Sequence, residues 1–278
     1  MGGQVKFTFY STSEDAARTT ALAAFAEFAR LEDVYSDYRP QSELMRLSAK
    51  AGQGPVPISS DLLEILRHSR RISVLTDGAF EVTASPIIRL WRKAREDGKM
   101  PPAEALAEAR SRVGFRRLSI DPIASTIALE PGTSLDLGGI AKGWACEAAV
   151  NVFRSHGINS VLVEAGGDIA AGDAPPEREG WAIAIRGRED DPILLANQSM
   201  STSGDAYQFV EIEGNRYSHI VDPRTGLGVT NRVQATVISR NGADADALAT
   251  ALCVLAPTNV SEYERRFKCR IILIRSRD

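Results

Sequence analysis

The chain has 278 residues, of which 44% are hydrophobic and 25% are charged, so it can form one large globular domain or two smaller lobes. Its formal net charge of -3 offers no basic surplus for neutralising a nucleic-acid backbone, and nucleic acid is not an expected partner. No apolar run reaches the roughly 18 residues of a membrane helix, and three scattered cysteines favour neither a disulfide framework nor a cysteine zinc site.

The N-terminal segment predicts a strand followed by a long helix. Gln4–Tyr10 alternates apolar and polar residues, as a half-buried strand does. Ser11 and Glu14 have the spacing of a capping box, in which each residue satisfies a free backbone amide of the other. The Ala- and Phe-rich segment that follows keeps helical periodicity to about Leu31.

The remaining elements mix helices and strands without strict alternation. In chain order we expect a helix from Ser59 or Ser60 to Gly78, a turn and short helix over 81–94, a helix from 101 to about 113, strands at about 117–120 and 125–130, an interior strand over 159–167, an antiparallel meander over 181–240, a helix over 243–256 and a strand over 269–275. This order favours an α+β fold over a doubly wound parallel sheet.

One segment needs a physical explanation, the stretch SLDLGGIAKGWACE that begins at Ser134. Asp136 is followed by Gly138-Gly139 and then by Lys142, although each glycine inside a helix costs roughly 1 kcal/mol. Glycine lets backbone amides approach an anion closely, and the start of a helix favours negative charge. The segment therefore predicts either an anion site or a set of tight turns.

Two further glycine segments have the same character. Gly166-Gly167 adjoins Asp168, and Gly204 adjoins Asp205. Neither known phosphate fingerprint is present, because the P-loop ending Lys-Ser/Thr and the GxGxxG spacing are both missing. The spacing alone leaves ligand loops and simple turns open.

The helix expected over 243–256 carries a candidate metal site. Asp246 and Thr250 are four residues apart, so a carboxylate and a hydroxyl lie on one helix face. Two hard oxygen donors suit Mg²⁺, which takes its remaining ligands from water and substrate phosphates. The alternative is that the Thr250 hydroxyl donates to the carbonyl of Asp246, as helical threonines often do.

His219 is a candidate general base. It lies just before the Asp222-Pro223 break, and its imidazole titrates near neutrality, as a proton acceptor for an attacking hydroxyl must. The alternative is an ordinary packed or surface histidine.

Taken together, these segments resemble the ApbE family, the FAD:protein FMN transferases. The resemblance runs nearly from end to end and rests on blocks that follow the family's order: MGGQVKFTFY, SDYRPQSELMRL, TDGAFEVTASPIIRLW, LDLGGIAKGWACE, VEAGGDIAAGD, STSGDAYQF, YSHIVDPRTG and ADALATAL. It implies a single catalytic domain over residues 1–278, with a T-fold-like α+β architecture of mixed and antiparallel sheets. It also implies two lobes with an FAD cleft between them.

The resemblance also implies roles for individual residues. Around FAD it suggests Met1, Tyr38, Ala79, Phe80, Glu81, Asp136, Lys142 and Ile220; for Mg²⁺, with Mn²⁺ as an alternative, it suggests the side chains of Asp246 and Thr250 and the backbone carbonyl of Gly139. Asp136 is left with two candidate roles, recognition of the adenine or ribose and structural anchoring.

The chemistry that the resemblance implies is cleavage of the FAD pyrophosphate. The FMN half passes to a serine or threonine hydroxyl of an acceptor flavoprotein, and AMP is released. Lys142 and the metal held by Asp246 would stabilise negative charge, and His219 would take the hydroxyl proton. The alternatives are an Mg²⁺-dependent FAD pyrophosphatase and a non-catalytic FAD-binding protein.

The sequence departs from the family pattern in several places. Glu81 stands where the family usually has Asp, Leu227-Gly228 replaces an aromatic-Pro pair, and Ser218 replaces a common second histidine. The N-terminus shows no basic region followed by an apolar stretch, so no signal peptide is expected. The compartment stays open: cytoplasmic as written, or periplasmic and membrane-anchored if a leader was removed.

Overall fold

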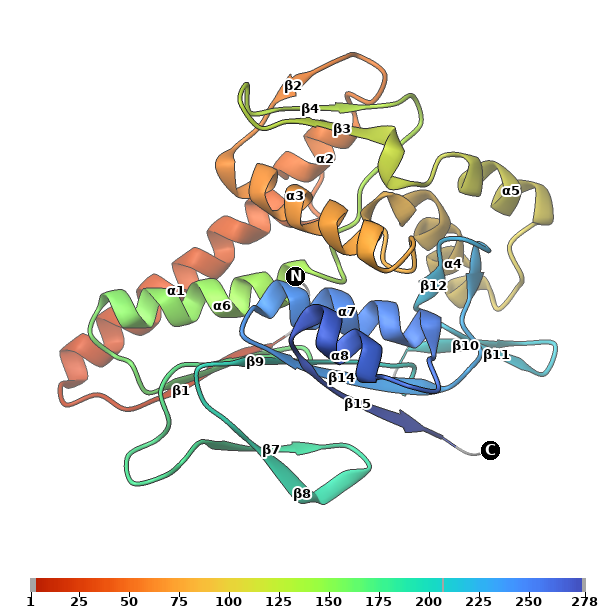
Figure 1. Ribbon diagram of the computed structural model, residues 1–278. Coiled ribbons are helices and arrows are strands. Elements are labelled where there is room, and N and C mark those ends of the chain that lie inside the picture. Colours follow the sequence, from red (N-terminus) through yellow and green to blue (C-terminus); the bar gives the residue numbers. More distant parts are fainter. Residues whose placement is uncertain (1–3, 207, 277–278) are drawn as a thin grey trace.

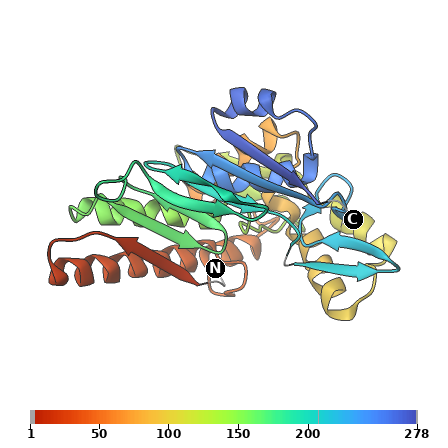
Figure 2. The ribbon, with the colours of Figure 1, turned by 90° about the horizontal axis from the view of Figure 1, so that it is seen from below.

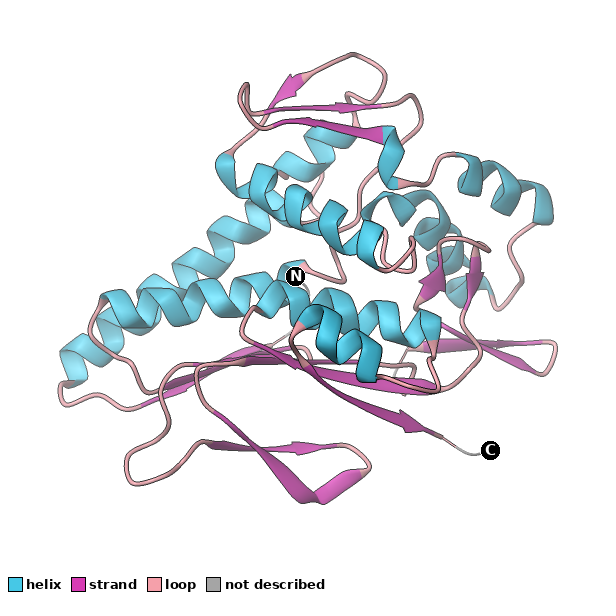
Figure 3. Ribbon diagram, viewed as in Figure 1, coloured by secondary structure: helices cyan, strands magenta, loops and turns pink. Residues whose placement is uncertain are grey.

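A central antiparallel sheet with helices on one face organises the computed structural model, which describes residues 4–206 and 208–276 (Figures 1 and 3). Its strand order is β1-β5-β6-β9-β14-β15, and every neighbouring pair is antiparallel. The strands are β1 (Val5–Phe9), β5 (Val161–Ala165), β6 (Asp168–Ala171), β9 (Ser199–Ser203), β14 (Val233–Ser239) and β15 (Arg270–Arg275). The predicted α+β class is confirmed.

Three helices cover one face of this sheet: α1 (Glu14–Tyr35), α6 (Ala141–Ser155) and α7 (Gly242–Leu255). Alternate strand residues such as Val161, Val163 and Val237 are buried in the core that these helices share. The short helix α8 (Ser261–Phe267) leads into β15. No helix in the part of the chain that the structure describes is both long and apolar enough to cross a membrane.

The opposite face is covered by one hairpin, β7 (Trp181–Ile185) and β8 (Arg188–Leu195). On this side, Leu162, Met200 and Ile238 of the main sheet pack against Trp181 and Leu195 of the hairpin and form a separate apolar cluster. Figure 2 shows the strands of the main sheet from this side. Because both faces are covered, the interior strands are mostly apolar or neutral on both sides; Glu164 of β5 and Asp168 of β6 are the charged exceptions.

The remaining elements lie beyond α6 and α7, at the top and right of Figure 1. They are α2 (Glu43–Ser48), β2 (Val56–Pro57), α3 (Ser60–Leu75), η1 (Val82–Ala84), α4 (Ser85–Asp97), α5 (Ala103–Ser111), η2 (Phe115–Arg117), β3 (Leu118–Asp121), β4 (Thr126–Leu129), β10 (Phe209–Ile212), β11 (Asn215–Ser218), β12 (Val221–Asp222) and β13 (Leu227–Gly228). A small sheet has the order β2-β4-β3, and α4 packs with α5, β10 and β12.

Serine side chains that cap the first turn fix where α1 and α3 begin. The predicted start of α3 is confirmed, since the Ser59 hydroxyl accepts from the Leu62 amide at 3.2 Å. The predicted capping box of α1 is wrong: Ser13, not Ser11, caps the helix by accepting from the Ala16 amide at 3.3 Å. The helix also continues past Leu31, because the apolar stripe extends to the buried Tyr35.

The predicted meander over 181–240 is also wrong in its order. Hairpins β7–β8, β10–β11 and β12–β13 form from neighbouring strands, but β9 and β14 join the main sheet. β9 and β14 pair with each other although a segment of chain separates them, because most of their residues are buried. In β10, which lies between them in the sequence, exposed and buried residues alternate.

Candidate active site

The centre of the candidate site is the crossing of α6 and α7, where two glycines touch. A Cβ on Gly143 would lie 2.1 Å from the carbonyl oxygen of Gly242, and a Cβ on Gly242 would lie 2.2 Å from the carbonyl oxygen of Gly143. No other residue type fits at either position. The glycines let the N-terminal turns of the two helices approach backbone to backbone.

This close approach places Asp246 of α7 against the first turn of α6. Its Oδ2 accepts a hydrogen bond from the Gly143 amide at 3.1 Å. The N-cap residue of α6, Ile140, has no side chain that can cap, so the carboxylate of a distant residue satisfies this free amide. The Oδ1 atom of Asp246 accepts no hydrogen bond from any residue that the structure describes.

Lys142 lies between two buried carboxylates. Its Nζ forms an ion pair with Asp168 Oδ2 and is 3.6 Å from Asp246 Oδ2. Burial opposes its charge, but the two carboxylates outweigh burial, and the pKa of Lys142 is raised above its ordinary value. Burial and the neighbouring Asp168 together raise the pKa of Asp246 to about 7, against the opposing effect of Lys142. One ammonium thus faces two carboxylates, and a further positive charge nearby would stabilise the ionised form of Asp246.

The Gly138–Gly139 turn lies beside Thr250. A Cβ on Gly139 would be 3.1 Å from Thr250 Oγ1 and 3.4 Å from Phe80 Cε2, so a side chain there would be tightly packed against both. The Gly139 carbonyl accepts no backbone hydrogen bond within the described residues. Thr250 Oγ1 is 3.3 Å from the Ser203 hydroxyl and makes no bond to the Asp246 carbonyl, so the back-bonding alternative is not what the structure shows.

These three groups are of the chemical kinds that bind a small hard cation. A carboxylate oxygen, a hydroxyl and a free carbonyl oxygen are donors that Mg²⁺ prefers, and a cation here would favour the ionised form of Asp246. Residues 4–206 and 208–276 contain no group of three or more His, Cys, Asp or Glu side chains that could hold a metal. The predicted set includes only one such side chain, Asp246.

Asp136 anchors the glycine turn from within. Its Oδ1 accepts from the Gly138 amide at 2.7 Å, and its Oδ2 accepts from Arg92 Nη2 at 2.9 Å. Arg92 also pairs with Asp37 at 2.6 Å. Of the two roles predicted for Asp136, structural anchoring is therefore observed directly.

The loop after α3 supplies the predicted Ala79, Phe80 and Glu81. Ala79 and Phe80 are buried, and Phe80 reaches the Gly139 turn. The Glu81 carboxylate is also buried and accepts hydrogen bonds from the Ser73 hydroxyl at 2.8 Å and from the Thr83 amide and hydroxyl at 3.1 and 2.9 Å. Glu81 thus holds this loop in shape through contacts inside the protein.

His219 and Ile220 come from the loop between β11 and β12. His219 Nδ1 is 3.1 Å from the carbonyl oxygen of Gln208, which can only accept, so the neutral ring carries its proton on Nδ1 and leaves Nε2 free. Burial lowers the pKa of His219, and the charges of Arg95 and Lys142 lower it further. Ile220 is buried, and its amide bonds to the Ser218 hydroxyl at 3.0 Å.

The structure thus joins most of the predicted residues through a chain of contacts. Lys142 contacts Asp246, and the Gly139 turn lies against Thr250 and Phe80. Asp246 and Thr250 are about one turn apart on α7, and Asp136 is attached through Gly138. Tyr38 is 69% exposed and lies over Arg92. Met1 lies outside the described residues.

Three contact residues were not predicted as part of the site: Asp168, Arg92 and Asp37. Asp168 had a signal in the sequence, since it follows Gly166-Gly167. Arg92 and Asp37 had no such signal, because they join the site only through contacts in the folded chain: Arg92 pairs with both Asp37 and Asp136.

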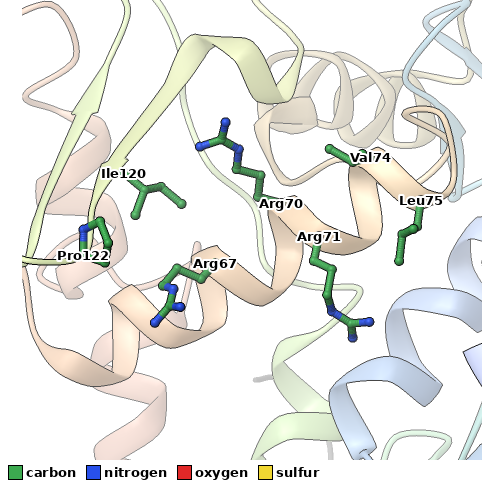
Figure 4. Close-up of a pocket in the computed structure, with 7 residues that line it drawn as sticks. All are labelled: Arg67, Arg70, Arg71, Val74, Leu75, Ile120 and Pro122. Atoms are coloured by element: carbon green, nitrogen blue, oxygen red, sulfur yellow. The ribbon is translucent and has the colours of Figure 1, made fainter.

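Two surface hollows are defined by side chains. One of about 240 Å³ is lined by the Gly166–Asp168 turn and by the Lys6–Glu164 ion pair, so it borders the cluster at Asp168. The other, of about 430 Å³, lies along α3 and includes Arg67, Arg70 and Ile120 (Figure 4). This second hollow contains none of the predicted site residues.

Comparison with known proteins identifies relatives of this chain. The FAD:protein FMN transferase of Vibrio cholerae is 34% identical over 236 residues, covering 81% of this chain and 70% of that protein. The enzyme of that name from Treponema pallidum is 34% identical over 245 residues, covering 81% and 68%.

Solved structures give the same result for the fold. The flavin transferase ApbE from Vibrio cholerae superposes with a TM-score of 0.87 at 29% identity, covering 100% of this chain and 92% of that one. The ApbE protein of Thermotoga maritima gives 0.89 at 27% identity, covering 99% and 94%. A sequence model of the ApbE family matches residues 1–273. The chain therefore belongs to the ApbE family.

Proposed function

We propose that this chain is an Mg²⁺-dependent FAD:protein FMN transferase, which moves the FMN half of FAD to a serine or threonine hydroxyl of an acceptor flavoprotein. The names of its relatives support flavin transfer to protein. The observation that supports the proposal is the pair of contacts near the α6–α7 crossing: Lys142 lies beside the Asp246 carboxylate and, about one turn along α7, the Gly139 turn lies against the Thr250 hydroxyl.

The proposed reaction breaks the pyrophosphate bond of FAD. The acceptor oxygen bonds to the phosphorus of the FMN half, its proton is taken up by the protein, and AMP leaves. Mg²⁺ bound by Asp246, Thr250 and the Gly139 carbonyl would supply charge stabilisation at the diphosphate. Lys142 adds a fixed positive charge, which Asp168 holds in place through their ion pair.

His219 is the proposed proton acceptor. Its lowered pKa keeps the ring neutral at physiological pH, and its Nε2 has no hydrogen-bond partner among the described residues. A neutral imidazole with one free nitrogen can accept the hydroxyl proton. Protonation of His219 at low pH would remove the lone pair that accepts the proton, and burial lowers the pKa at which this occurs.

Replacing His219 with Gln should lower FMN transfer by roughly two to four orders of magnitude, the usual contribution of a general base. FAD affinity should stay close to that of the unaltered chain. The rate of the unaltered chain should be flat above pH 7 and fall only below the ordinary histidine pKa of about 6.5. Transfer measured from pH 5 to 9 tests both points, and an active His219→Gln variant would remove His219 from the proton transfer.

The function itself is tested by incubating the chain with FAD and Mg²⁺, with and without a flavoprotein that exposes a Ser/Thr acceptor motif. A covalently fluorescent acceptor, with an added FMN mass and one AMP released, supports transfer. Free FMN in both reactions would replace the proposal with FAD hydrolysis. A stable yellow complex without AMP would replace it with FAD storage.

Two other expectations are part of the same proposal. Contact with a membrane would occur only through the acceptor or through a leader upstream of this sequence. The two-lobed arrangement, with FAD bound between the lobes, stays a prediction.

A further inference from the structure

Arg92 on α4 holds together three segments that are far apart in the sequence. Its Nη1 is 2.6 Å from Asp37 Oδ2, its Nη2 is 2.9 Å from Asp136 Oδ2, and its guanidinium lies 4.5 Å from the centre of the Tyr38 ring. The Arg92 side chain is 27% exposed, whereas the Asp136 side chain is 6% exposed. A planar guanidinium can make these contacts at once, and a lysine ammonium cannot.

Tyr38 is the exposed part of this arrangement. Its side chain is an exposed aromatic in a chain whose large apolar groups are mostly buried. The guanidinium covers one face of the ring, so the opposite face is available to a ligand. Planar aromatic rings stack favourably on such a face, and a cation held behind the ring fixes its tilt.

Asp136 is the inward-facing part. The carboxylate that Arg92 contacts through Oδ2 accepts the Gly138 amide through Oδ1 at 2.7 Å. The next residue, Gly139, packs on Thr250 and has the free carbonyl described above. Arg92 therefore links the exposed ring to the glycine turn through two short contacts.

We propose that Arg92 is a positioning residue that fixes Tyr38 as a stacking platform for one planar ring of the dinucleotide, at a set distance from the glycine turn that faces the diphosphate. This inference rests on the proposed function. A dinucleotide is held at two places, its ring and its diphosphate, and both must fit at once for productive binding. Arg92 contacts neither reacting atom, so it acts on binding more than on the chemical step.

The charges around Asp136 provide an independent signature. Burial and the facing Asp37 raise the pKa of Asp136 to about 6, and Arg92 opposes that rise. Arg95, from the same helix, lies close enough to Arg92 and Tyr38 to affect them electrostatically. Removal of the Arg92 charge should therefore move the pH midpoint of FAD binding upward, which loss of packing alone would not do.

The test compares Arg92→Gln and Arg92→Lys with Lys93→Gln, a change at the neighbouring exposed position on α4. Arg92→Gln should raise the Kd and KM for FAD about fivefold, the upper end for loss of an exposed cation–aromatic contact. Its kcat should stay within about threefold. Arg92→Lys should be intermediate, because an ammonium keeps the charge but lacks the planar guanidinium that stacks on the Tyr38 ring. Lys93→Gln should match the unaltered chain.

Binding of ADP and of FMN identifies the ring. If adenine stacks on Tyr38, Arg92→Gln weakens ADP and FAD alike and leaves FMN unchanged; if the flavin stacks there, FMN weakens and ADP does not. Either pattern supports the inference. FAD affinity within twofold of the unaltered chain, or a loss in kcat with unchanged KM, would overturn it. A chain that binds FAD but transfers nothing would end the proposed function, while the binding measurements would still decide the role of Arg92.

Discussion

Asp246→Ala is expected to lower FMN transfer by about two to three orders of magnitude, because loss of one electrostatic contact at a developing charge costs roughly 3–4 kcal/mol. The substitution removes a proposed metal ligand, and it also removes the acceptor of the Gly143 amide and one of the two carboxylates at Lys142. Transfer rates with saturating Mg²⁺ and FAD measure the effect. Full activity would exclude Asp246 from the mechanism.

Asp246→Asn tests the charge of this side chain alone, because Asn has nearly the same shape as Asp but does not ionise. The pKa of Asp246 is raised to about 7 from 3.8, so between about pH 4 and pH 7 the folded chain keeps a proton that the unfolded chain has released. The contribution of this group to stability is therefore complete below pH 4 and is lost as the pH rises through 7. Without Mg²⁺, the Asn variant should gain stability relative to the unaltered chain over that range.

Thermal unfolding with and without Mg²⁺ checks this expectation. Mg²⁺ should raise the Tm of the unaltered chain at pH 7.5 and leave that of Asp246→Asn unchanged, since a ligand stabilises only the state that binds it. Asp244→Asn is the matched control on the same helix, because Asp244 contacts His68 and belongs to no proposed ligand set. An equal Mg²⁺ response in all three proteins would contradict the proposed metal site.

Gly143→Ala should give the largest loss of stability. The new methyl would lie 2.1 Å from the Gly242 carbonyl oxygen and 2.8 Å from Asp246 Cβ, and the first of these atoms belongs to a backbone that cannot turn away. Overpacking of this kind costs about 3 kcal/mol, which lowers the Tm by roughly 5–10 °C in a chain of this size.

Gly204→Ala is the matched control, because its nearest neighbours would be 3.3 Å from the new Cβ and neither residue has a positive φ. Its Tm should change by no more than about 2 °C, as a substitution without severe overlap does. Calorimetry of both variants without Mg²⁺ isolates packing from metal binding. A Gly143→Ala protein as stable as the unaltered chain would show that α6 and α7 can move apart.

Local chemistry made much of the fold predictable. The helix over 243–256, the strand over 159–167 and the cap at Ser59 follow from periodicity and side-chain type, and the structure has all three. The start of α1 and the order of strands between 181 and 240 did not follow, since neighbouring serines can each cap a helix and pairing partners depend on burial.

The sequence by itself determined the family, the α+β class and the helix face that carries Asp246 and Thr250, because ordered motifs and helical spacing are local properties of the chain. Only the tertiary structure decided that Asp168 pairs with Lys142, 26 positions earlier, and that Arg92 binds Asp136, 44 positions later. It likewise decided that Asp246 caps Gly143 across 103 positions. Such contacts arise from packing of distant elements, and no spacing rule encodes them.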